Sequence, residues 1–152
     1  MNAIDLLMAD HKEVERMFKE TEGAVRAKKR DLFFQIKAEL ETHAYIEETI
    51  FYPTLQAEGG DKLIELTAEA IQEHIGMKCF LGELSAVSTD ASKFDPLLTK
   101  LIEDVRHHVK EEEGEMFPAV KKRFAKDALD LLGAQMKSEK QRFQLSTETI
   151  YG

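Results

Sequence analysis

Apolar residues recur every three or four positions along five stretches of the chain, a spacing typical of amphipathic helices. The stretches are about residues 3–23, 31–57 and 61–88, a fourth that begins at 95, and a fifth at about 127–145. The alternating pattern expected of a strand does not stand out anywhere. The pattern therefore predicts an all-α protein. We expect an up-down-up-down four-helix bundle over residues 1–125, with an extra C-terminal helix and tail, 126–152, packed on the same domain.

Local signals predict where these helices begin and end. Asp31 is expected to cap the second helix, because an aspartate side chain accepts hydrogen bonds from the free backbone N–H groups of a first turn. Asp95-Pro96 predicts the start of the fourth helix, since proline fits a first helical turn. Gly59-Gly60 predicts the break after the second helix. A fifth helix is expected to carry Leu131, Leu132, Met136 and Phe143.

Composition and charge narrow the class of protein. The chain has 152 residues, 43% hydrophobic and 33% charged, which is typical of one globular domain. Its 21 basic and 29 acidic side chains give a formal net charge of −8, which argues against a nucleic acid or an anionic membrane as partner. The amphipathic, acidic N-terminus is unlike a signal peptide. The lone Cys79 allows no internal disulfide. We therefore expect a cytoplasmic protein.

The chain also contains a two-part repeat. The segments HAYIEETIFYP, residues 43–53, and HVKEEEGEMFP, residues 108–118, align without a gap at an offset of 65 residues. Both read His-x-x-x-Glu-Glu and both end in proline. A weaker pair, Asp10-His11 and Glu73-His74, repeats at an offset of 63. Two matched helical hairpins are predicted, related by a pseudo-twofold axis.

Six polar residues occupy inward positions on the apolar faces of the four predicted helices. They are His11, His43, Glu47, His74, His108 and Glu112. Residues four apart share a helix face, so each histidine of the long repeat lies one turn from its glutamate. A helix rises 1.5 Å per residue, so each of the four histidines is predicted to lie about 18–21 Å along its helix from the turn that joins it to the next. In antiparallel helices this places the four at the same height along the bundle axis. The six groups are therefore expected to build one site.

Bound cations would explain this set of residues. A lone inward histidine is usually a core residue with a hydrogen-bond partner, and a lone glutamate usually forms a salt bridge. Two buried carboxylates without positive partners, however, would be costly. Four imidazoles and two carboxylates exceed the four ligands of one zinc. Divided between two metals, they give each about two histidines and one carboxylate, the ligand mix of reactive non-haem iron.

With FYP and FP following the paired motifs, these residues resemble the hemerythrin (HHE cation-binding) domain over roughly residues 2–125. The resemblance implies two iron ions with an oxo or hydroxo bridge, held by the six residues in a four-helix bundle. It also implies that Glu47 and Glu112 bridge the irons. Members of this family bind dioxygen, sense oxygen or redox state, handle nitric oxide or peroxide, or supply iron for cluster repair.

One position departs from the oxygen-carrying members, which place a second histidine one turn after the histidine of the third helix. This chain has Lys78 there, and lysine is a poor ligand at neutral pH. An inward-pointing Lys78 ammonium could stabilise bound peroxide by a charge-assisted hydrogen bond. Tyr52 is a candidate replacement ligand, although helical counting sets it about 180° from His43. The alternative is that Tyr52 is a core aromatic residue with its hydroxyl hydrogen-bonded.

Other polar residues near the stripes are expected to lie outside the site. His107 lies about 100° from the His108 stripe, so it is predicted to flank the site or face solvent. Tyr45 is predicted on the surface. The acidic run from Glu111 to Glu115 is predicted to face solvent except for Glu112.

Three functions follow as hypotheses. The first is a di-iron protein that reacts with peroxide, nitric oxide or dioxygen, for example a catalase-like, peroxidase-like or nitric-oxide-handling oxidoreductase, with an unknown reductant. The second is reversible binding, storage or sensing of dioxygen. The third is donation of iron for iron-sulfur cluster repair. The lost histidine at Lys78 favours the first.

Overall fold

The computed structural model describes residues 1–151, with side chains described up to Thr147. Helical segments account for almost all of this part of the chain, and it contains no strand. The segments are α1 (Ala3–Thr21), α2 (Arg26–Ile46), η1 (Glu47–Phe51), α3 (Tyr52–Glu58), α4 (Asp61–Ala86), α5 (Ala91–Glu111), η2 (Glu112–Met116), α6 (Phe117–Arg123) and α7 (Lys126–Tyr151). Gly152, the end of the predicted tail, lies outside the described residues.

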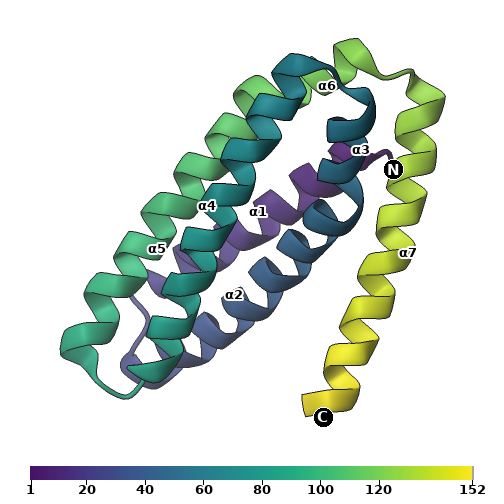
Figure 1. The fold of residues 1–152 in the computed structure, drawn as a ribbon. Coiled ribbons are helices and arrows are strands. Elements are labelled where there is room, and N and C mark those ends of the chain that lie inside the picture. The colour runs from purple at the N-terminus through teal and green to yellow at the C-terminus, as the bar shows by residue number, and fades with distance from the viewer. Residues whose placement is uncertain (152) are drawn as a thin grey trace.

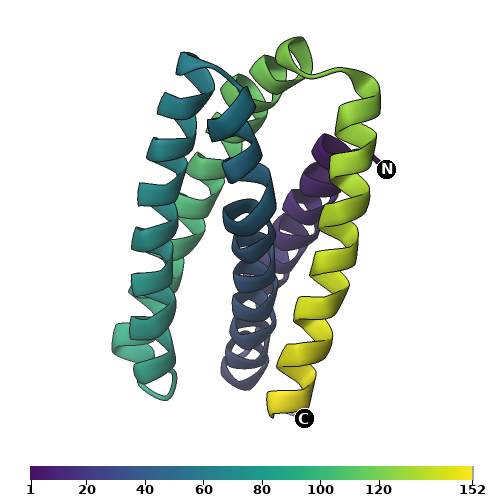
Figure 2. The same ribbon diagram turned by 45° about the vertical axis from the view of Figure 1, so that its right-hand side comes forward.

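The helices form the predicted up-down-up-down bundle with one added helix (Figure 1). Helix α2 continues through η1 into α3, and α5 continues through η2 into α6, so each of these runs is one long rod. Together with α1 and α4, they make four antiparallel helices. Helix α7 packs against α1 and α2 on the outside of the bundle (Figure 2).

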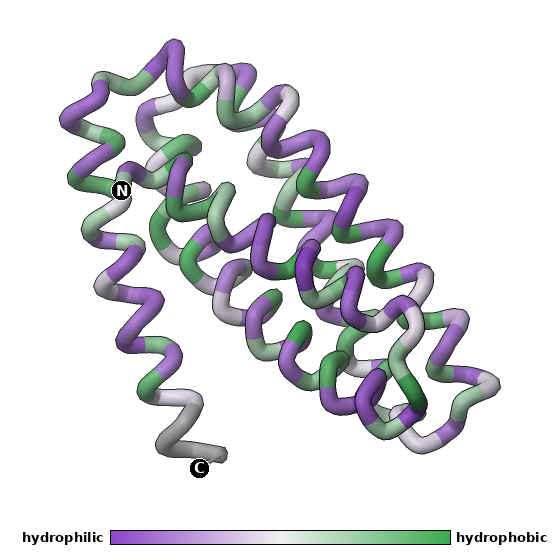
Figure 3. Tube along the Cα trace, turned by 180° about the vertical axis from the view of Figure 1, so that it is seen from behind, coloured by the Kyte–Doolittle hydropathy of each residue, from purple (hydrophilic) through white to green (hydrophobic). Residues whose placement is uncertain are grey.

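Two apolar clusters fill the bundle, one on each side of a polar layer. The first gathers the start of α1, the α3 and α6 ends and α7, with Leu7 and Phe51 as members. The second gathers the other end of the bundle, with Val14 and Phe33 as members. His11 lies between Leu7 and Val14 on α1, so the polar layer falls between the clusters. Hydrophobic and hydrophilic residues alternate along every helix of the bundle (Figure 3).

Two predicted helix starts were wrong. Helix α2 begins at Arg26, five residues before Asp31, which lies inside the helix and caps nothing. Helix α5 begins at Ala91, and its cap is Asp90, whose side chain accepts a hydrogen bond from the Ser92 N–H. Asp95-Pro96 therefore lies within α5. Pro96 is inside the helix rather than in its first turn, and α5 lacks the hydrogen bond that an N–H at this position would donate to the Ser92 carbonyl.

Helix α7 is fixed to the bundle by its own apolar face. Leu129, Leu132 and Met136 are buried in the first apolar cluster, whereas Leu131 is exposed, contrary to its predicted place on that face. Gly133 lies against the start of α1: a Cβ atom there would be 2.6 Å from the Met1 carbonyl oxygen. The absence of a side chain at Gly133 thus allows α7 and the N-terminus to approach closely.

No helix of the described chain is long and apolar enough to span a lipid bilayer.

Replacing Gly133 by alanine is predicted to destabilise the protein, because the new methyl group would collide with backbone atoms that cannot rotate away. Overpacking of this kind costs about 1–3 kcal/mol. Gly82→Ala is the matched control, since among the described residues no atom beyond its own helical turn lies within 4 Å of its Cβ position. That variant should gain roughly 0.5–1 kcal/mol from helix propensity. Urea unfolding measures both, and a Gly133→Ala variant as stable as Gly82→Ala would contradict this packing.

Candidate metal centre

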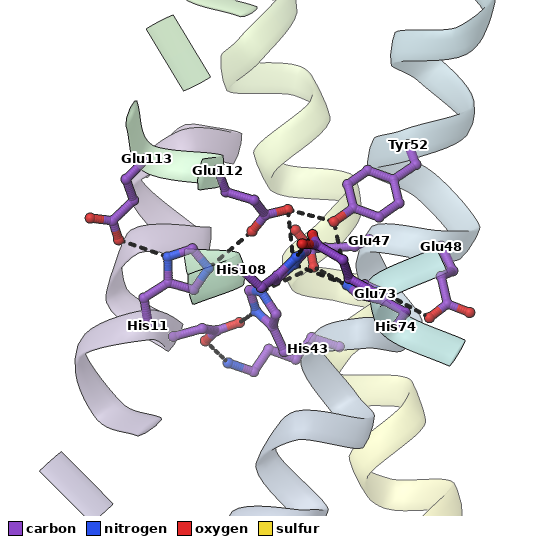
Figure 4. A network of polar contacts seen from close by, with 12 residues as sticks. His11, His43, Glu47, Glu48, Tyr52, Glu73, His74, His108, Glu112 and Glu113 are labelled. Atoms are coloured by element: carbon purple, nitrogen blue, oxygen red, sulfur yellow. Dashed lines mark hydrogen bonds and ion pairs between the residues drawn. The ribbon is translucent and has the colours of Figure 1, made fainter. Parts of the chain in front are cut away.

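Each inward histidine is oriented by a carboxylate on a different helical segment (Figure 4). In all four, Nδ1 faces a carboxylate oxygen at hydrogen-bond distance. The distances are 2.7 Å from His11 to Glu113, 2.8 Å from His43 to Asp10, 2.8 Å from His74 to Glu48 and 2.6 Å from His108 to Glu73. Because an ionised carboxylate only accepts hydrogen bonds, each Nδ1 donates. This leaves the Nε2 atoms directed into the bundle, the arrangement by which proteins orient metal-binding histidines.

The inward atoms lack the partners that burial normally demands. Among the described residues, five buried site atoms accept or donate no hydrogen bond within the usual geometry: Nε2 of His11 and of His43, both carboxylate oxygens of Glu47, and Oε1 of Glu112. Glu47 is completely buried and Glu112 almost so. Buried polar atoms are nearly always satisfied, and an unpaired buried carboxylate is especially costly. These residues therefore fit a bound cation.

The site atoms form two groups, each large enough to hold one metal ion. One group is His11, His43 and Glu112, and the other is Glu47, His74 and His108. Within each group the ligand atoms lie within 4.8 Å of one another. In this grouping, each glutamate falls with two histidines of other helices, although it also contacts the histidine one turn before it.

Both glutamates lie between the two groups. Glu47 Oε1 is 3.2 Å from Nε2 of His43 and 3.2 Å from Nε2 of His74, which belong to different groups. Glu112 likewise faces His11 at 3.2 Å and His108 at 3.6 Å. His74 and His108 meet at 3.3 Å between their Nε2 atoms. The six residues thus form one continuous cluster.

A π-helical turn follows the histidine in both copies of the repeat. The Tyr52 N–H bonds the Glu47 carbonyl, and the Phe117 N–H bonds the Glu112 carbonyl, in each case five residues back. Such turns insert an extra residue into a helix and are frequent at functional sites. The following proline lacks an N–H and would crowd a regular α-helical turn, which favours the wider turn at that place.

The π turn brings Tyr52 to the site, where simple helical counting does not. Tyr52 is completely buried, and its hydroxyl donates a short hydrogen bond to Glu112 Oε2. The Tyr52 hydroxyl oxygen also lies 3.4 Å from His74 Nε2. Burial, together with the charges of Glu112 and Glu47, raises the pKa of Tyr52 well above its usual value. The phenol therefore holds its proton next to Glu112 when no cation is bound.

Lys78 lies outside the layer, contrary to the hypothesis of an inward ammonium. Its Nζ is 2.7 Å from Glu48 Oε1, and its side chain is 51% exposed. The buried face of α4 runs through Leu63, Thr67, Ala70, His74, Leu81 and Leu84, in steps of three and four except for the seven residues between His74 and Leu81. Met77 continues this series, so the residue after it is turned away from the bundle. Lys78 reaches the site only through Glu48, which hydrogen-bonds His74.

The carboxylates that orient the histidines were missed from the sequence, although the repeats contained the signal. Glu48 and Glu113 are the second glutamates of His-x-x-x-Glu-Glu, and Asp10 and Glu73 are the acidic residues before the histidines of the shorter pair. Glu113 was predicted to face solvent, and it is only partly exposed because it contacts His11.

Two further residues can be placed. His107 is exposed, as predicted, and contacts Glu111 at 3.1 Å. Tyr45, predicted on the surface, is instead half-buried and stacks on Phe143 of α7 with 4.3 Å between ring centres. The sequence pattern of α2 alone could not show that α7 would cover that side.

A small apolar cavity adjoins the histidines. It has a volume of about 20 Å³, room for one water-sized molecule. Besides the four histidines and Asp10, it is lined by Val14, Leu40, Ala44, Met77, Val105 and Val109. The site therefore offers a small molecule a largely apolar space on one side of the metal-binding atoms.

Comparison with known families agrees with this geometry. Residues 2–120 match the model of the hemerythrin HHE cation-binding domain. The chain belongs to the hemerythrin family. The two groups of histidines and glutamates in this domain fit a di-iron site.

Similar proteins extend this comparison. The hemerythrin fold recurs in the crystal structure of an HHE cation-binding domain-containing protein, an Rv2633c homologue from Mycobacterium kansasii. That structure is 25% identical, has a TM-score of 0.82, and is matched over 96% of this chain and 89% of its own. A DNA nickase of Nostoc sp. is 28% identical over 95% of this chain and 40% of its own length. An uncharacterized hemerythrin-like protein of Schizosaccharomyces pombe is 28% identical over 59% of this chain and 44% of its own. The chain therefore spans about two fifths of the curated relatives it matches.

The buried charges make the stability of the metal-free hemerythrin domain depend on pH. Burial lowers the pKa of His108, but Glu112 and Glu73 outweigh burial and raise it to about 9. Burial is likewise outweighed at His43, where Glu47 and Asp10 raise the pKa well above its usual value. Conversely, His43 holds the pKa of Glu47 well below its usual range despite burial. In the absence of a cation, protons on His43 and His108 balance the charge of the buried carboxylates.

We predict that the unfolding temperature of metal-free protein falls as the pH rises from about 6.5 towards 9. A raised histidine pKa stabilises the fold fully below the unfolded value, and this contribution is lost as pH rises through the folded value. Thermal unfolding in a chelator, across that range, measures the effect. His108→Gln should flatten the profile, whereas His107→Gln, at an exposed position, should not. A metal-free profile that is level or rises would contradict the account.

Proposed function

We propose that this chain is a non-haem di-iron protein that reacts with small oxidants such as peroxide, nitric oxide or dioxygen. The observation that carries the proposal is the convergence, from four helices, of buried imidazole and carboxylate atoms, five of which have no hydrogen-bond partner among the described residues. Two histidines and a carboxylate per metal, with positions left open, are the ligand set of reactive non-haem iron. The iron pair would supply the electrons and the binding position for the oxidant.

In this proposal, His11, His43 and Glu112 would hold one iron, and Glu47, His74 and His108 would hold the other. Glu47 and Glu112 would be shared by the two irons, a role supported by their contacts to histidines of both groups. The outer carboxylates keep the Nδ1 proton on each ring, so that Nε2 is the metal-binding atom.

Other residues of the chain control what reaches the irons. The cavity of about 20 Å³ has room for one water-sized molecule. Its valine, leucine and alanine side chains make part of the surroundings of the imidazoles apolar. The Tyr52 hydroxyl holds a proton at Glu112, within reach of the site interior. Tyr52 could therefore donate this proton to the bound oxidant. Alternatively, Tyr52 could itself bind iron through its phenol oxygen.

The position of Lys78 favours oxidant chemistry over carriage. Oxygen-carrying hemerythrins have an additional histidine at this position, whereas Lys78 of this chain contacts Glu48. The chain therefore supplies no imidazole from this position. An iron with fewer nitrogen ligands keeps a further open position. Reversible dioxygen binding is the second candidate, and it is favoured by the apolar lining of the cavity, which suits an uncharged diatomic molecule.

A nucleic-acid substrate is not part of the proposal, although one relative is named a DNA nickase. The chain carries a net charge of −8, and strong DNA binding needs a basic face. We expect a small-molecule ligand, an electron donor still to be identified, and a cytoplasmic setting.

The proposal predicts the fate of iron-loaded protein that is reduced without air and then exposed to dioxygen or peroxide. We expect prompt conversion to the ferric state that does not reverse when the gas is pumped away. Two ferrous ions would give two electrons to the oxidant, and the reduced product (hydrogen peroxide from dioxygen, water from peroxide, with protons from solvent) would leave the site. Optical spectra and the ferric content of the same sample measure this. An absorption change that reverses fully under vacuum would favour the dioxygen carrier instead.

Two tyrosine variants act as internal controls for this experiment. If Tyr52 binds iron, the ferric protein has a broad visible band that Tyr52→Phe abolishes. If Tyr52 only hydrogen-bonds Glu112, the variant keeps the same spectrum. Tyr45→Phe is matched, since its hydroxyl bonds Glu139 of α7 rather than the site, and it should leave the spectrum unchanged.

A further inference from the structure

The four carboxylates that orient the histidines differ sharply in burial. The side chains of Glu48, Glu73 and Glu113 are 29%, 31% and 36% exposed, so water solvates part of their charge. The side chain of Asp10, the partner of His43, is 6% exposed. A buried carboxylate loses its hydration and needs a cation or further hydrogen bonds in return.

Helix α7 supplies that cation. Lys140 Nζ lies 2.5 Å from Asp10 Oδ1, while Asp10 Oδ2 accepts the hydrogen bond from His43 Nδ1 at 2.8 Å. The Lys140 side chain is itself largely buried, at 22% exposure. A continuous chain of contacts therefore joins α7 to a residue of the His11, His43 and Glu112 group.

The neighbours of Lys140 hold α7 against the same turn of α2. Glu139 accepts a hydrogen bond from the Tyr45 hydroxyl at 2.7 Å, and Phe143 stacks on the Tyr45 ring. Tyr45 lies between His43 and Glu47 in the chain. Helix α7 begins at Lys126, beyond residue 120, where the match to the family model ends. The contact is therefore made by a helix outside the matched hemerythrin module.

We propose that Lys140 is a positioning residue of the metal centre, which fixes Asp10 and, through it, the tautomer and ring orientation of His43. The proposal rests on the di-iron function above. Because Asp10 contacts His43 and not the histidines of the other group, the effect is confined to the metal at His11, His43 and Glu112. Docking of α7 and binding of that metal thus support one another.

The test is a stepwise anaerobic titration of the metal-free 152-residue protein with Fe(II), repeated with Co(II), in competition with a chelator. Losing the partner of a metal-binding histidine costs roughly 10–100-fold in affinity. Since Lys140 acts one contact further out, Lys140→Met should weaken one of the two sites by about tenfold, the lower end of that range. The other site should keep its affinity.

Three further variants separate positioning from packing. Lys137→Met removes the same charge from an exposed position of α7 and should change neither site. Lys140→Arg keeps the cation and should restore most of the lost affinity. Asp10→Asn keeps an acceptor for His43 but removes the charge that Lys140 balances, so Lys140→Met should cost little more in that background. This last comparison also remains informative if Lys140→Met alone folds poorly.

The outcomes are distinct. One weakened site with arginine rescue supports the proposal. Two unchanged affinities overturn it, and so does equal weakening of both sites with a lowered unfolding temperature, which would show a merely structural role. Wild-type protein that fails to bind two metals would instead refute the di-iron function, so the two failures are distinguishable.

Discussion

Charge buried in the middle of an apolar bundle is the constraint on which this structure depends. Glu47 and Glu112 lie almost without solvent exposure between two apolar clusters, among four imidazoles. Such a layer is stable only if cations or protons balance the carboxylates. The outer carboxylates, the π turns and the packing of α7 each hold this layer in an arrangement suited to metal ions.

The layer also shows how a repeated sequence makes a single site. Within each hairpin, the acidic residue before one histidine orients the other: Asp10 contacts His43, and Glu73 contacts His108. Between hairpins, the second glutamate of each long motif orients a histidine of the other half. The two halves differ at one position beside the carboxylates. The first half has Tyr52 where the second has Phe117, and the Tyr52 hydroxyl donates a hydrogen bond to Glu112.

Helical periodicity was sufficient to predict the bundle and the meeting of the six inward residues. The buried face of each helix shows which residues point inward, and the number of residues from each turn gives their height along the bundle. It could not place Tyr52, since one π turn changes the rotation of everything after it. It left Lys78 as a candidate for the site interior because the buried residue after His74 could be three or four positions further along the helix. In α4 it is three positions further, at Met77, and Lys78 faces outward. Tyr45 and Leu131 were misplaced because the contacts of α7 depend on tertiary packing. The role of the outer carboxylates required knowing which helices are neighbours.

The most direct test of the central claim is anomalous X-ray diffraction at the iron edge from crystals of iron-loaded protein. The account predicts two iron peaks in the polar layer, one among His11, His43 and Glu112 and one among Glu47, His74 and His108, with both glutamates between them. A single peak, or iron bound elsewhere with the six side chains left unliganded, would contradict it.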